Sequence, residues 1–390
     1  MIFDPFDPEV IADPYPAYAR LHEQAPVTYI EERQIWVIAG YEHVRTALRD
    51  HARVSSAQGV MYIRAPLPMM LTMDPPDHER LRRIVGREFA PKDIHRFRPA
   101  IERFVTEGLD ELRDTGDVVT SLAVPVPVRV IASIMGVPDA DLPELRRISN
   151  DIVEGFKITP VGTNPLEGFQ RVPEAIRELE AYFSGLIAER RSRPADDMIT
   201  KLLAPAIDGV LSEYELFWFC LLLLVAGIET TTNLIGNMVI ALHDHPDQWD
   251  KLKRDRSLVA AAVNECLRFD SPIQGLYRQT AQEYAVGGAA IPAGHRVLIA
   301  FAAANRDPSH YLEPHVLDVE RNPTDHLAFG AGIHRCLGAG LAELEGRVVL
   351  EHLLDLVDEL EINGEVERTT HPTLRGATSV PLRVVEKASR

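Results

Sequence analysis

The sequence predicts one large, mainly helical domain with small β-sheets toward its two ends. From Pro75 to about Asp270, nearly every segment has apolar residues at helical spacing. Short strand-like runs precede and follow this stretch. A chain of 390 residues is long enough for two or three domains, but no linker rich in Pro, Gly or Ser divides it. We therefore expect a single domain over residues 1–390, β-richer at both ends, around a helical body at about 75–270.

The elements follow in a clear order along the chain. Two strand-like runs near the start, VTYI and IWVIAG, are joined by EERQ and flanked by amphipathic helices. The helical body contains DHERLRRIVGREFA, FRPAIERFVTEGLDELRD and PEAIRELEAYFSGLIAERR. Residues Val153 to Gln170 carry Gly and Pro without periodicity, which predicts a mobile connection that could serve as a lid. After Pro272 the pattern changes to short runs, with one last long helix from about Leu337 to Leu360.

Composition and charge exclude several classes of protein. Apolar residues make up 46% and charged residues 25%, as in soluble globular proteins. The formal charge of -17 argues against a nucleic-acid binder, which needs a positive surface. The N-terminus shows no secretory pattern, and the apolar run Leu216 to Ile228 is too short to cross a bilayer. With three widely spaced cysteines, we expect a cytoplasmic protein without a membrane anchor.

A polar interruption lies inside the longest predicted helix. Ser212 and Glu215 form the S-x-x-E pattern of a capping box, so the helix should begin there. It then passes through AGIETTT, whose residues are weak helix formers. Ala226 and Thr230 lie four apart on one face, where a Thr hydroxyl can bond to the backbone, which predicts a groove with a hydroxyl and a carboxylate. The alternative is that Glu229 marks the point where the helix leaves the core.

Two further groups of charged residues could serve a site or merely be structural. Glu265 and Arg268 are three apart on one helix face in an apolar setting, where a buried pair needs full hydrogen bonding. The segment from His78 to Arg103 has eight Lys plus Arg against four acids in an otherwise acidic chain. His78 and Arg82 share a helix face and could meet an anionic group. The alternative is an ordinary solvated helix face.

The third cysteine stands in the stretch HLAFGAGIHRCLGAG. A zinc site is not expected there, because Cys336 lacks a paired ligand at close spacing, while a nucleophilic cysteine with His334 as base stays an alternative. The segment FGAGIHRCLG closely resembles the haem-binding loop of the cytochrome P-450 monooxygenases, F-G-x-G-x-H-x-C-x-G. All six fixed positions match, namely Phe329, Gly330, Gly332, His334, Cys336 and Gly338. In the family's order, DHERLR, AGIETT, ECLR and DVERNPTDHLAFG extend the resemblance over most of the chain.

This resemblance implies a fold and a cofactor. The expected structure is the single-domain cytochrome P-450 fold, shaped like a triangular prism, with haem b buried between the long central helix and the cysteine loop. Cys336 would be the axial thiolate ligand of the haem iron. The other cofactor contacts expected from the family are Phe329 and Gly330 around the sulfur, His78, Arg82, Arg278 and His334 at the propionates, and Ala226 and Gly227, which leave room for dioxygen.

The same resemblance assigns catalytic, structural and substrate residues. Thr230 and Glu229 would serve oxygen activation and proton delivery, and Glu265, Arg268 and Arg321 would form a structural triad behind the haem. By family placement and by the apolar, Met-rich character of the loop from Ser55 to Met73, the expected pocket residues are Met61, Ile63, Arg64, Leu223, Ile273 and Leu276. Arg64 could anchor a substrate carboxylate, or it could simply face outward from its loop.

The implied activity is that of a soluble, bacterial-type monooxygenase. It would insert one oxygen atom of O2 into a small-to-medium hydrophobic substrate, with electrons from NAD(P)H passed through a reductase and a ferredoxin or flavodoxin. An acidic partner of this kind would dock on a basic face around Arg82, Arg83, Arg87 and Arg335. The alternative is a haem-thiolate protein that binds or senses ligands, or acts as an isomerase or peroxygenase, without activating O2. Glu229 and Thr230 separate the two, since a pure binder needs no proton route.

Overall fold

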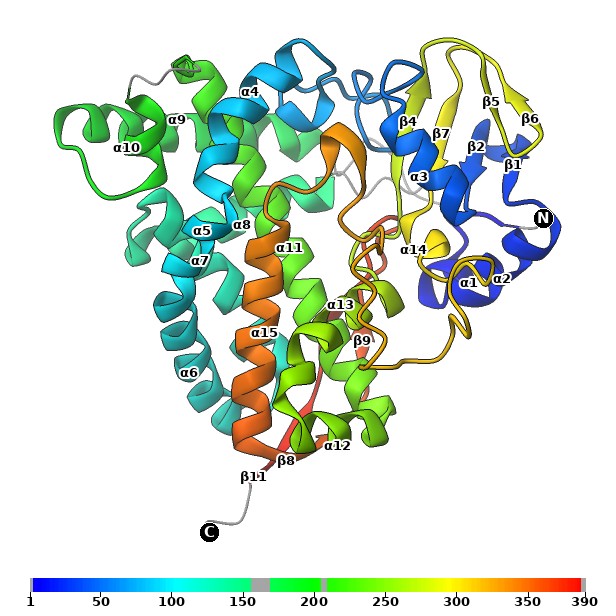
Figure 1. Cartoon of the computed structure of the whole chain (residues 1–390). Helices are drawn as coiled ribbons and strands as arrows, with labels where there is room; N and C mark the ends of the chain where they lie inside the picture. The colour runs from blue at the N-terminus through cyan, green and yellow to red at the C-terminus, as the bar shows by residue number, and fades with distance from the viewer. Residues whose placement is uncertain (1–2, 156–168, 205–208, 387–390) are drawn as a thin grey trace.

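A computed structural model describes residues 3–155, 169–204 and 209–386 (Figure 1). Its α-helices are α1 (Pro8–Ala12), α2 (Tyr15–Gln24), α3 (Tyr41–Arg49), α4 (Asp77–Val85), α5 (Pro91–Ile94), α6 (Arg98–Thr115), α7 (Pro125–Met135), α8 (Leu142–Gly155), α9 (Val172–Ser192), α10 (Met198–Leu203), α11 (Glu213–Asp244), α12 (Pro246–Arg254), α13 (Val259–Phe269), α14 (Phe301–Ala304) and α15 (Ala339–Leu356). The predicted helical body and the single, mainly helical domain are confirmed.

The strands are short and form small sheets. They are β1 (Val27–Ile30), β2 (Ile35–Ile38), β3 (Val54–Ser55), β4 (Leu276–Thr280), β5 (Tyr284–Val286), β6 (Ala289–Ile291), β7 (Arg296–Ile299), β8 (Val357–Ile362), β9 (Glu367–Arg368), β10 (Ala377–Ser379) and β11 (Leu382–Glu386). The largest sheet has the order β1-β2-β7-β4-β3, and β5-β6, β9-β10 and β8-β11 form pairs. The predicted strands VTYI and IWVI are β1 and β2, paired antiparallel.

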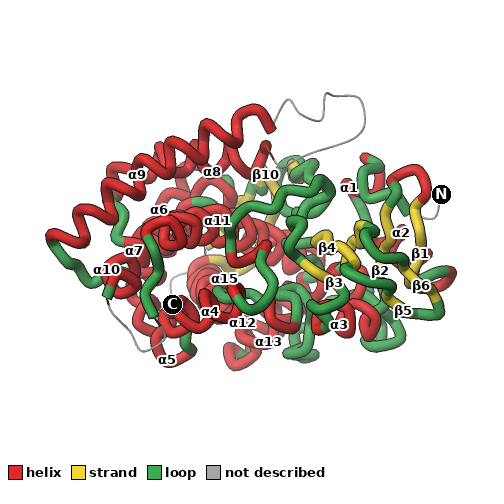
Figure 2. Tube along the Cα trace, turned by 90° about the horizontal axis from the view of Figure 1, so that it is seen from above, coloured by secondary structure: helices red, strands yellow, loops and turns green. Residues whose placement is uncertain are grey.

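The longest helices and the largest sheet lie on different sides of the molecule. Viewed from above, the long helices fill one side, and the large sheet lies on the other with α1, α2 and α3 beside it (Figure 2). The two faces of that sheet have separate cores, because successive side chains of a strand point to opposite faces. Val297 and Ile299 of β7 belong to one apolar cluster, while Leu298 packs with Tyr277 of β4 in another. Side chains on opposite faces of this sheet therefore do not share one site.

Helix α11 runs through the centre of the molecule, beside α15 (Figure 1). It begins where the sequence predicts, because the Ser212 side chain accepts from the N–H of Glu215 and the Glu215 carboxylate accepts from the N–H of Ser212. Most of its side chains are buried. Among the described residues, α11 is the helix long and apolar enough to cross a membrane, and two thirds of its most apolar window is buried inside the protein, as in a core helix.

Two expectations from the sequence do not hold as stated. The last long helix ends at Leu356 and not at Leu360, because residues from Val357 onward pair with β11, with Leu360 opposite Val384. Of the expected lid over Val153 to Gln170, residues 156–168 lie outside the described part of the chain. Its first residues belong to the end of α8, and Phe169–Arg171 form a short 3-10 turn before α9.

Candidate haem-thiolate site

The cysteine loop is shaped by short backbone hydrogen bonds just before α15. The N–H of Cys336 donates to the carbonyl of Phe329 at 2.9 Å, which closes the loop around the intervening glycines. Gly332 has φ of 70°, and a Cβ at this position would lie 2.3 Å from the carbonyl oxygen of Leu48 in α3. Glycine is therefore required at position 332 both by backbone conformation and by the close approach of α3.

The environment of Cys336 is prepared for a metal-bound sulfur. Cys336 is exposed, while Cys220 and Cys266 are buried in the core. The surrounding protein atoms raise the pKa of the Cys336 thiol, while an N–H donated by Gly338 and the charges of Arg82 and Arg335 lower it. The net shift of the pKa is upward. A coordinated metal ion removes the proton of a thiol, so a haem iron bound here would keep Cys336 as the thiolate.

Buried nitrogen donors without acceptors converge close to this loop. The rings of His78 (α4) and His334 lie 4.3 Å apart. Within the described part of the chain, neither ring nitrogen of His78 nor Nε2 of His334 has a hydrogen-bond partner. Arg278 of β4 is 4% exposed and donates to the carbonyl of Tyr277. Buried donors normally find acceptors, so this cluster fits an anionic group brought by a ligand, such as the propionates of haem.

The electrostatics of the cluster agree with that interpretation. Burial above all, with Arg278 and His78 next, lowers the pKa of His334 to about 2. Burial likewise lowers the pKa of His78, helped by Arg82, and that of Arg278 to about 10. Burial is the largest cause of all three shifts, and neighbouring positive charges add to it for the two histidines. Carboxylates placed among them would oppose all three shifts, because an opposite charge favours the protonated forms.

Arg82 lies in the same region with a different set of contacts. Its Nη2 donates to the carbonyl oxygen of Arg335 at 2.6 Å, which links α4 to the cysteine loop. Burial lowers the pKa of Arg82, while Cys336 raises it. The structure thus brings together Arg82, His78, His334 and Cys336, all of which the sequence motifs selected.

The polar interruption of α11 has the geometry that its spacing predicts. The hydroxyl of Thr230 donates to the carbonyl of Ala226 at 2.7 Å. Ala226 is exposed and Thr230 half-buried, although Leu223 before them and Thr231 after them are buried. From Thr231 to Leu242 every residue is buried, so the alternative that the helix leaves the core at Glu229 is wrong. The interruption instead leaves one face of a buried helix open.

Glu229 is a half-buried carboxyl on the same stretch of helix. Burial first, and then the nearby charge of Glu154, raises its pKa, while Arg146 and the amide of Asn233 lower it. Asn233 and Arg146 were not selected from the sequence. The four-residue spacing from Glu229 to Asn233 on one helix could have indicated the contact with Asn233. Arg146 comes from α8, and no local pattern connects it to α11.

Gly227 has a contact that the sequence did not predict. A Cβ at position 227 would lie 2.8 Å from Cδ1 of Ile131 in α7. The missing side chain therefore allows α7 and α11 to pack closely. Its contribution to an oxygen pocket stays a prediction, while Phe329, half-buried against the main core, stays the expected shield of the sulfur.

The three residues of the expected structural triad lie together. Glu265 and Arg268 are both fully buried, with Nε and Nη2 of Arg268 donating to the carboxylate at 2.8 and 2.7 Å. Arg321 adds a third contact from Nε to the same carboxylate at 3.2 Å. The remaining N–H groups of Arg268 reach the carbonyls of Asn305, Pro314 and Val316. The triad therefore ties α13 to the loop that precedes the cysteine segment.

The residues expected to line a substrate pocket fall into two groups. Leu223 is buried on α11, and Ile273 and Leu276 are half-buried on the sheet face that carries Arg278. Arg64 instead donates to Gln279 at 2.7 Å, and Gln279 alternates with Arg278 along β4, so it points to the opposite face. Ile63 lies beside Arg64 there, and the carbonyl of Met61 accepts from Arg296. The structure thus gives Arg64 the outward position that was its alternative.

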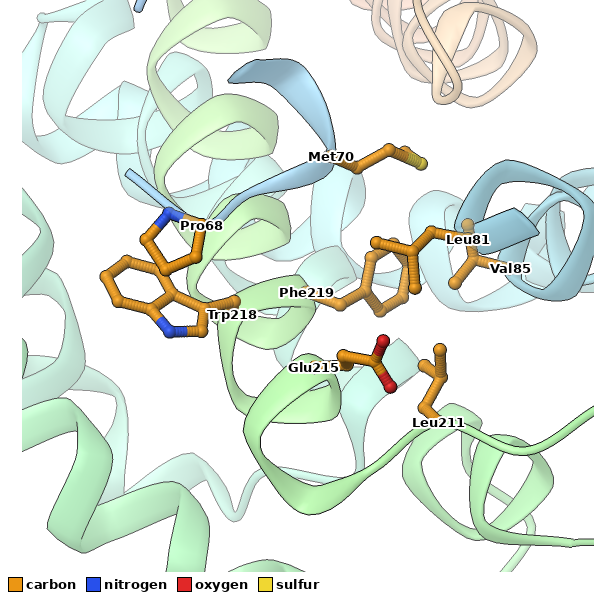
Figure 3. Close-up of a pocket in the computed structure, with 8 residues that line it drawn as sticks. All are labelled: Pro68, Met70, Leu81, Val85, Leu211, Glu215, Trp218 and Phe219. Carbon is orange, nitrogen blue, oxygen red and sulfur yellow. The ribbon is translucent and has the colours of Figure 1, made fainter. Parts of the chain in front are cut away.

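A small apolar cavity at the start of α11 is not large enough for a substrate (Figure 3). Its volume is about 10 Å³, which is room for one water molecule. Leu81 and Val85 of α4 face Phe219 of α11 across it, and the Glu215 carboxylate at its edge is paired with Arg80. The cavity is a packing gap between α4 and α11.

Comparisons with known proteins agree with this geometry. The profile of the cytochrome P450 family matches residues 13–370. A beta-dihydromenaquinone-9 omega-hydroxylase of Mycobacterium tuberculosis is 38% identical over 99% of this chain and 79% of its own length. A 6-deoxyerythronolide B hydroxylase of Saccharopolyspora erythraea is 36% identical over 95% of this chain and 96% of its own length.

Solved structures of cytochrome P450 proteins have the same fold as this chain. Cytochrome P450 CYP109Q5 from Chondromyces apiculatus is 34% identical, covers 100% of both chains and has a TM-score of 0.89. CYP109E1 from Bacillus megaterium, solved with testosterone, is 33% identical over 97% of this chain and 99% of its own, also with a TM-score of 0.89. The chain therefore belongs to the cytochrome P450 family of haem-containing monooxygenases.

Proposed function

We propose that this enzyme inserts one oxygen atom of O2 into a small-to-medium hydrophobic molecule at a haem b held by Cys336. The observation that carries the proposal is the cluster of buried, unpartnered donors on His78 and His334, with Arg278 beside them, close to the exposed thiol. Thiolate-bound haem supplies the activation of dioxygen and cleavage of its O–O bond. The protein's own residues bind the cofactor, position the substrate and deliver protons.

Proton delivery is assigned to Thr230 and Glu229. The Thr230 hydroxyl lies on the open face of α11, where it donates to the Ala226 carbonyl and, by rotating its single O–H away from that carbonyl, can donate to oxygen instead. The raised pKa of Glu229 makes its carboxyl a proton donor closer to neutral pH than an exposed glutamate. This pair favours an oxygenase over the second candidate, a haem-thiolate binder or isomerase, because a binder needs neither group.

Replacing Thr230 with Ala is expected to uncouple reductant use from product formation. Without the hydroxyl, proton delivery to oxygen is impaired. The electrons from NAD(P)H then form hydrogen peroxide in place of product. We expect the ratio of product to NAD(P)H oxidised to fall about tenfold. The measurement is product and hydrogen peroxide per NAD(P)H consumed, with Thr230→Ser as the matched control. Unchanged coupling in Thr230→Ala would remove this role from the residue.

The proposed substrate is hydrophobic because the residues assigned to its pocket are apolar. Leu223, Ile273 and Leu276 supply this surface and no charge. Relatives are named as hydroxylases of beta-dihydromenaquinone-9, 6-deoxyerythronolide B and vitamin D(3), and a neighbour was solved with testosterone. Lipophilic polycyclic and isoprenoid compounds are therefore the first to screen, using the shift of the haem absorption band as the measure of binding.

The proposed electron donor is a ferredoxin or flavodoxin that docks around Arg82, Arg83, Arg87 and Arg335, in the cytoplasm. These cations lie on α4, the turn after it and the cysteine loop, within a strongly acidic chain. An acidic partner would be steered to the side of the molecule where the thiolate lies. The electrons would originate from NAD(P)H through a reductase.

The docking proposal predicts a salt-sensitive first electron transfer. Raising ionic strength screens the attraction, and Arg83→Glu reverses one of its charges, so we expect a fall of about tenfold in the second-order rate for the variant. Stopped-flow reduction under carbon monoxide measures this rate. Arg383→Glu is the matched control, since Arg383 is exposed on β11 and paired with Glu361. If neither salt nor Arg83→Glu changed the rate of the first electron transfer, this face would be excluded as the docking site.

A further inference from the structure

A basic depression lies on the face of the large sheet opposite Arg278, apart from the haem cluster. It has a volume of about 580 Å³, and Arg33, Arg64, His295 and Arg296 are among its lining residues. Its strands β2, β7 and β4 lie side by side at the edge of the molecule away from the helical body (Figure 1). Arg296 lies opposite Gln279 in the β7–β4 pair, and Arg278 opposite Val297. Arg296 therefore points away from the face that carries Arg278.

The charges in this depression are not balanced by the protein. Asp4 neutralises Arg33 through a bond of 2.6 Å from Nη2. Arg64 donates to the Gln279 amide oxygen and, at 3.1 Å, to the carbonyl of Gly294. Within residues 3–155, 169–204 and 209–386, no carboxylate is hydrogen-bonded to Arg64 or Arg296. Two guanidinium groups thus share one depression without a counter-charge, in a protein of formal charge -17.

Arg296 is the most unusual of these groups. Its side chain is 5% exposed, its Nη2 donates to the carbonyls of Gly59 and Met61, and its Nε and Nη1 have no partner among the described residues. Burial first, and then the neighbouring Arg64, lowers its pKa to about 10. Leaving buried donors unpaired beside a second cation is costly unless an acceptor arrives from outside.

We propose that this depression binds the phosphate or carboxylate group of a small acidic molecule between Arg64 and Arg296. A planar guanidinium presents parallel N–H donors that match the oxygens of such groups, and charge-assisted bonds of this kind are stronger than neutral ones. The Tyr62 hydroxyl, which donates to the carbonyl of Arg33, lies at the same surface and limits its size. The site lies on the other face of the sheet from Arg278 and does not depend on the proposed haem chemistry.

Calorimetric titration of the haem-loaded protein with inorganic phosphate, at neutral pH and constant ionic strength, tests the proposal. We expect saturable binding to one site and about tenfold weaker binding to Arg64→Gln, which removes one charged donor group. Arg296→Lys keeps the positive charge but loses the parallel N–H donors of the guanidinium, so we expect it to weaken phosphate binding as well. Arg383→Gln, at an exposed arginine on β11, should bind phosphate as the unchanged protein does.

A parallel titration with succinate distinguishes the two sources of the oxyanion. Saturable binding of either probe that depends on Arg64 supports the site and names its preferred group. Two results would overturn the proposal: neither probe saturates, or Arg383→Gln weakens binding as much as Arg64→Gln. The haem absorption spectrum is recorded in the same samples and should not change. A negative result for this anion site therefore leaves the monooxygenase proposal intact. Likewise, a negative result for the monooxygenase proposal leaves this anion site intact.

Discussion

Replacing Cys336 with Ala is expected to abolish product formation with O2 and an electron donor. The loop that carries Cys336 is closed by the bond from its own N–H to the carbonyl of Phe329, which alanine preserves. The fold should therefore survive while the ligand atom is lost. Without a thiolate, the electron density that promotes O–O cleavage is missing, and no other described side chain is placed to supply it.

The matched control for that experiment is Cys266→Ala. Cys266 is buried in α13, where burial raises the pKa of its thiol far above the usual range. Cys266 has no role in the proposed chemistry, so we expect the Cys266→Ala variant to keep full activity. Product yield per haem, measured over a fixed time, checks both variants. Activity in Cys336→Ala, or its loss in Cys266→Ala alone, would contradict the assignment of the ligand.

Replacing Arg268 with Ala is expected to have the largest effect on stability. All five N–H donors of its guanidinium are used, two on Glu265 and three on backbone carbonyls, with no solvent access. Removing it leaves the buried Glu265 carboxylate with Arg321 as its one charged partner and the N–H of Asp318 as a further donor. Breaking a buried pair in this way costs about 3–5 kcal/mol of the free energy of unfolding.

Urea denaturation of the haem-loaded protein, with haem retention after gel filtration, measures this loss. Arg45→Ala provides the control, since Arg45 forms an exposed pair with Glu42 at 2.7 Å, and such pairs contribute about 1 kcal/mol or less. Arg321→Ala should fall between the two, because Arg321 is partly exposed and touches only one carboxylate oxygen. If Arg268→Ala unfolded at the same urea concentration as Arg45→Ala, the triad would not be a folding element.

Local patterns predicted those parts of the protein that local physics determines. The start of α11 follows from the capping box at Ser212 and Glu215, and the bond from Thr230 to Ala226 follows from their four-residue spacing. The end of α15 was placed too late, since Val357 to Leu360 is helix-compatible alone and becomes a strand only by pairing with β11.

Contacts between distant segments could not be read from the chain. Position 227 has no room for a side chain because Ile131 of α7 lies against it. Arg146 of α8 lowers the pKa of Glu229 from a separate helix. Arg64 was grouped with the substrate residues by its position in a Met-rich loop. Its actual partner, Gln279, shows that the loop crosses to the other face of the sheet. Motif spacing selected His78, Arg82, His334 and Cys336, which lie together in the structure, because the family pattern already encodes such distant contacts.

Iron-edge X-ray absorption of the haem-loaded protein tests the central claim most directly, because it identifies the atom bound to iron. We expect a sulfur neighbour in the unchanged protein and in Cys266→Ala. In Cys336→His the sulfur should be replaced by nitrogen. A sulfur neighbour that persists in Cys336→His, or its absence from the unchanged protein, would contradict the account of Cys336 as the haem ligand.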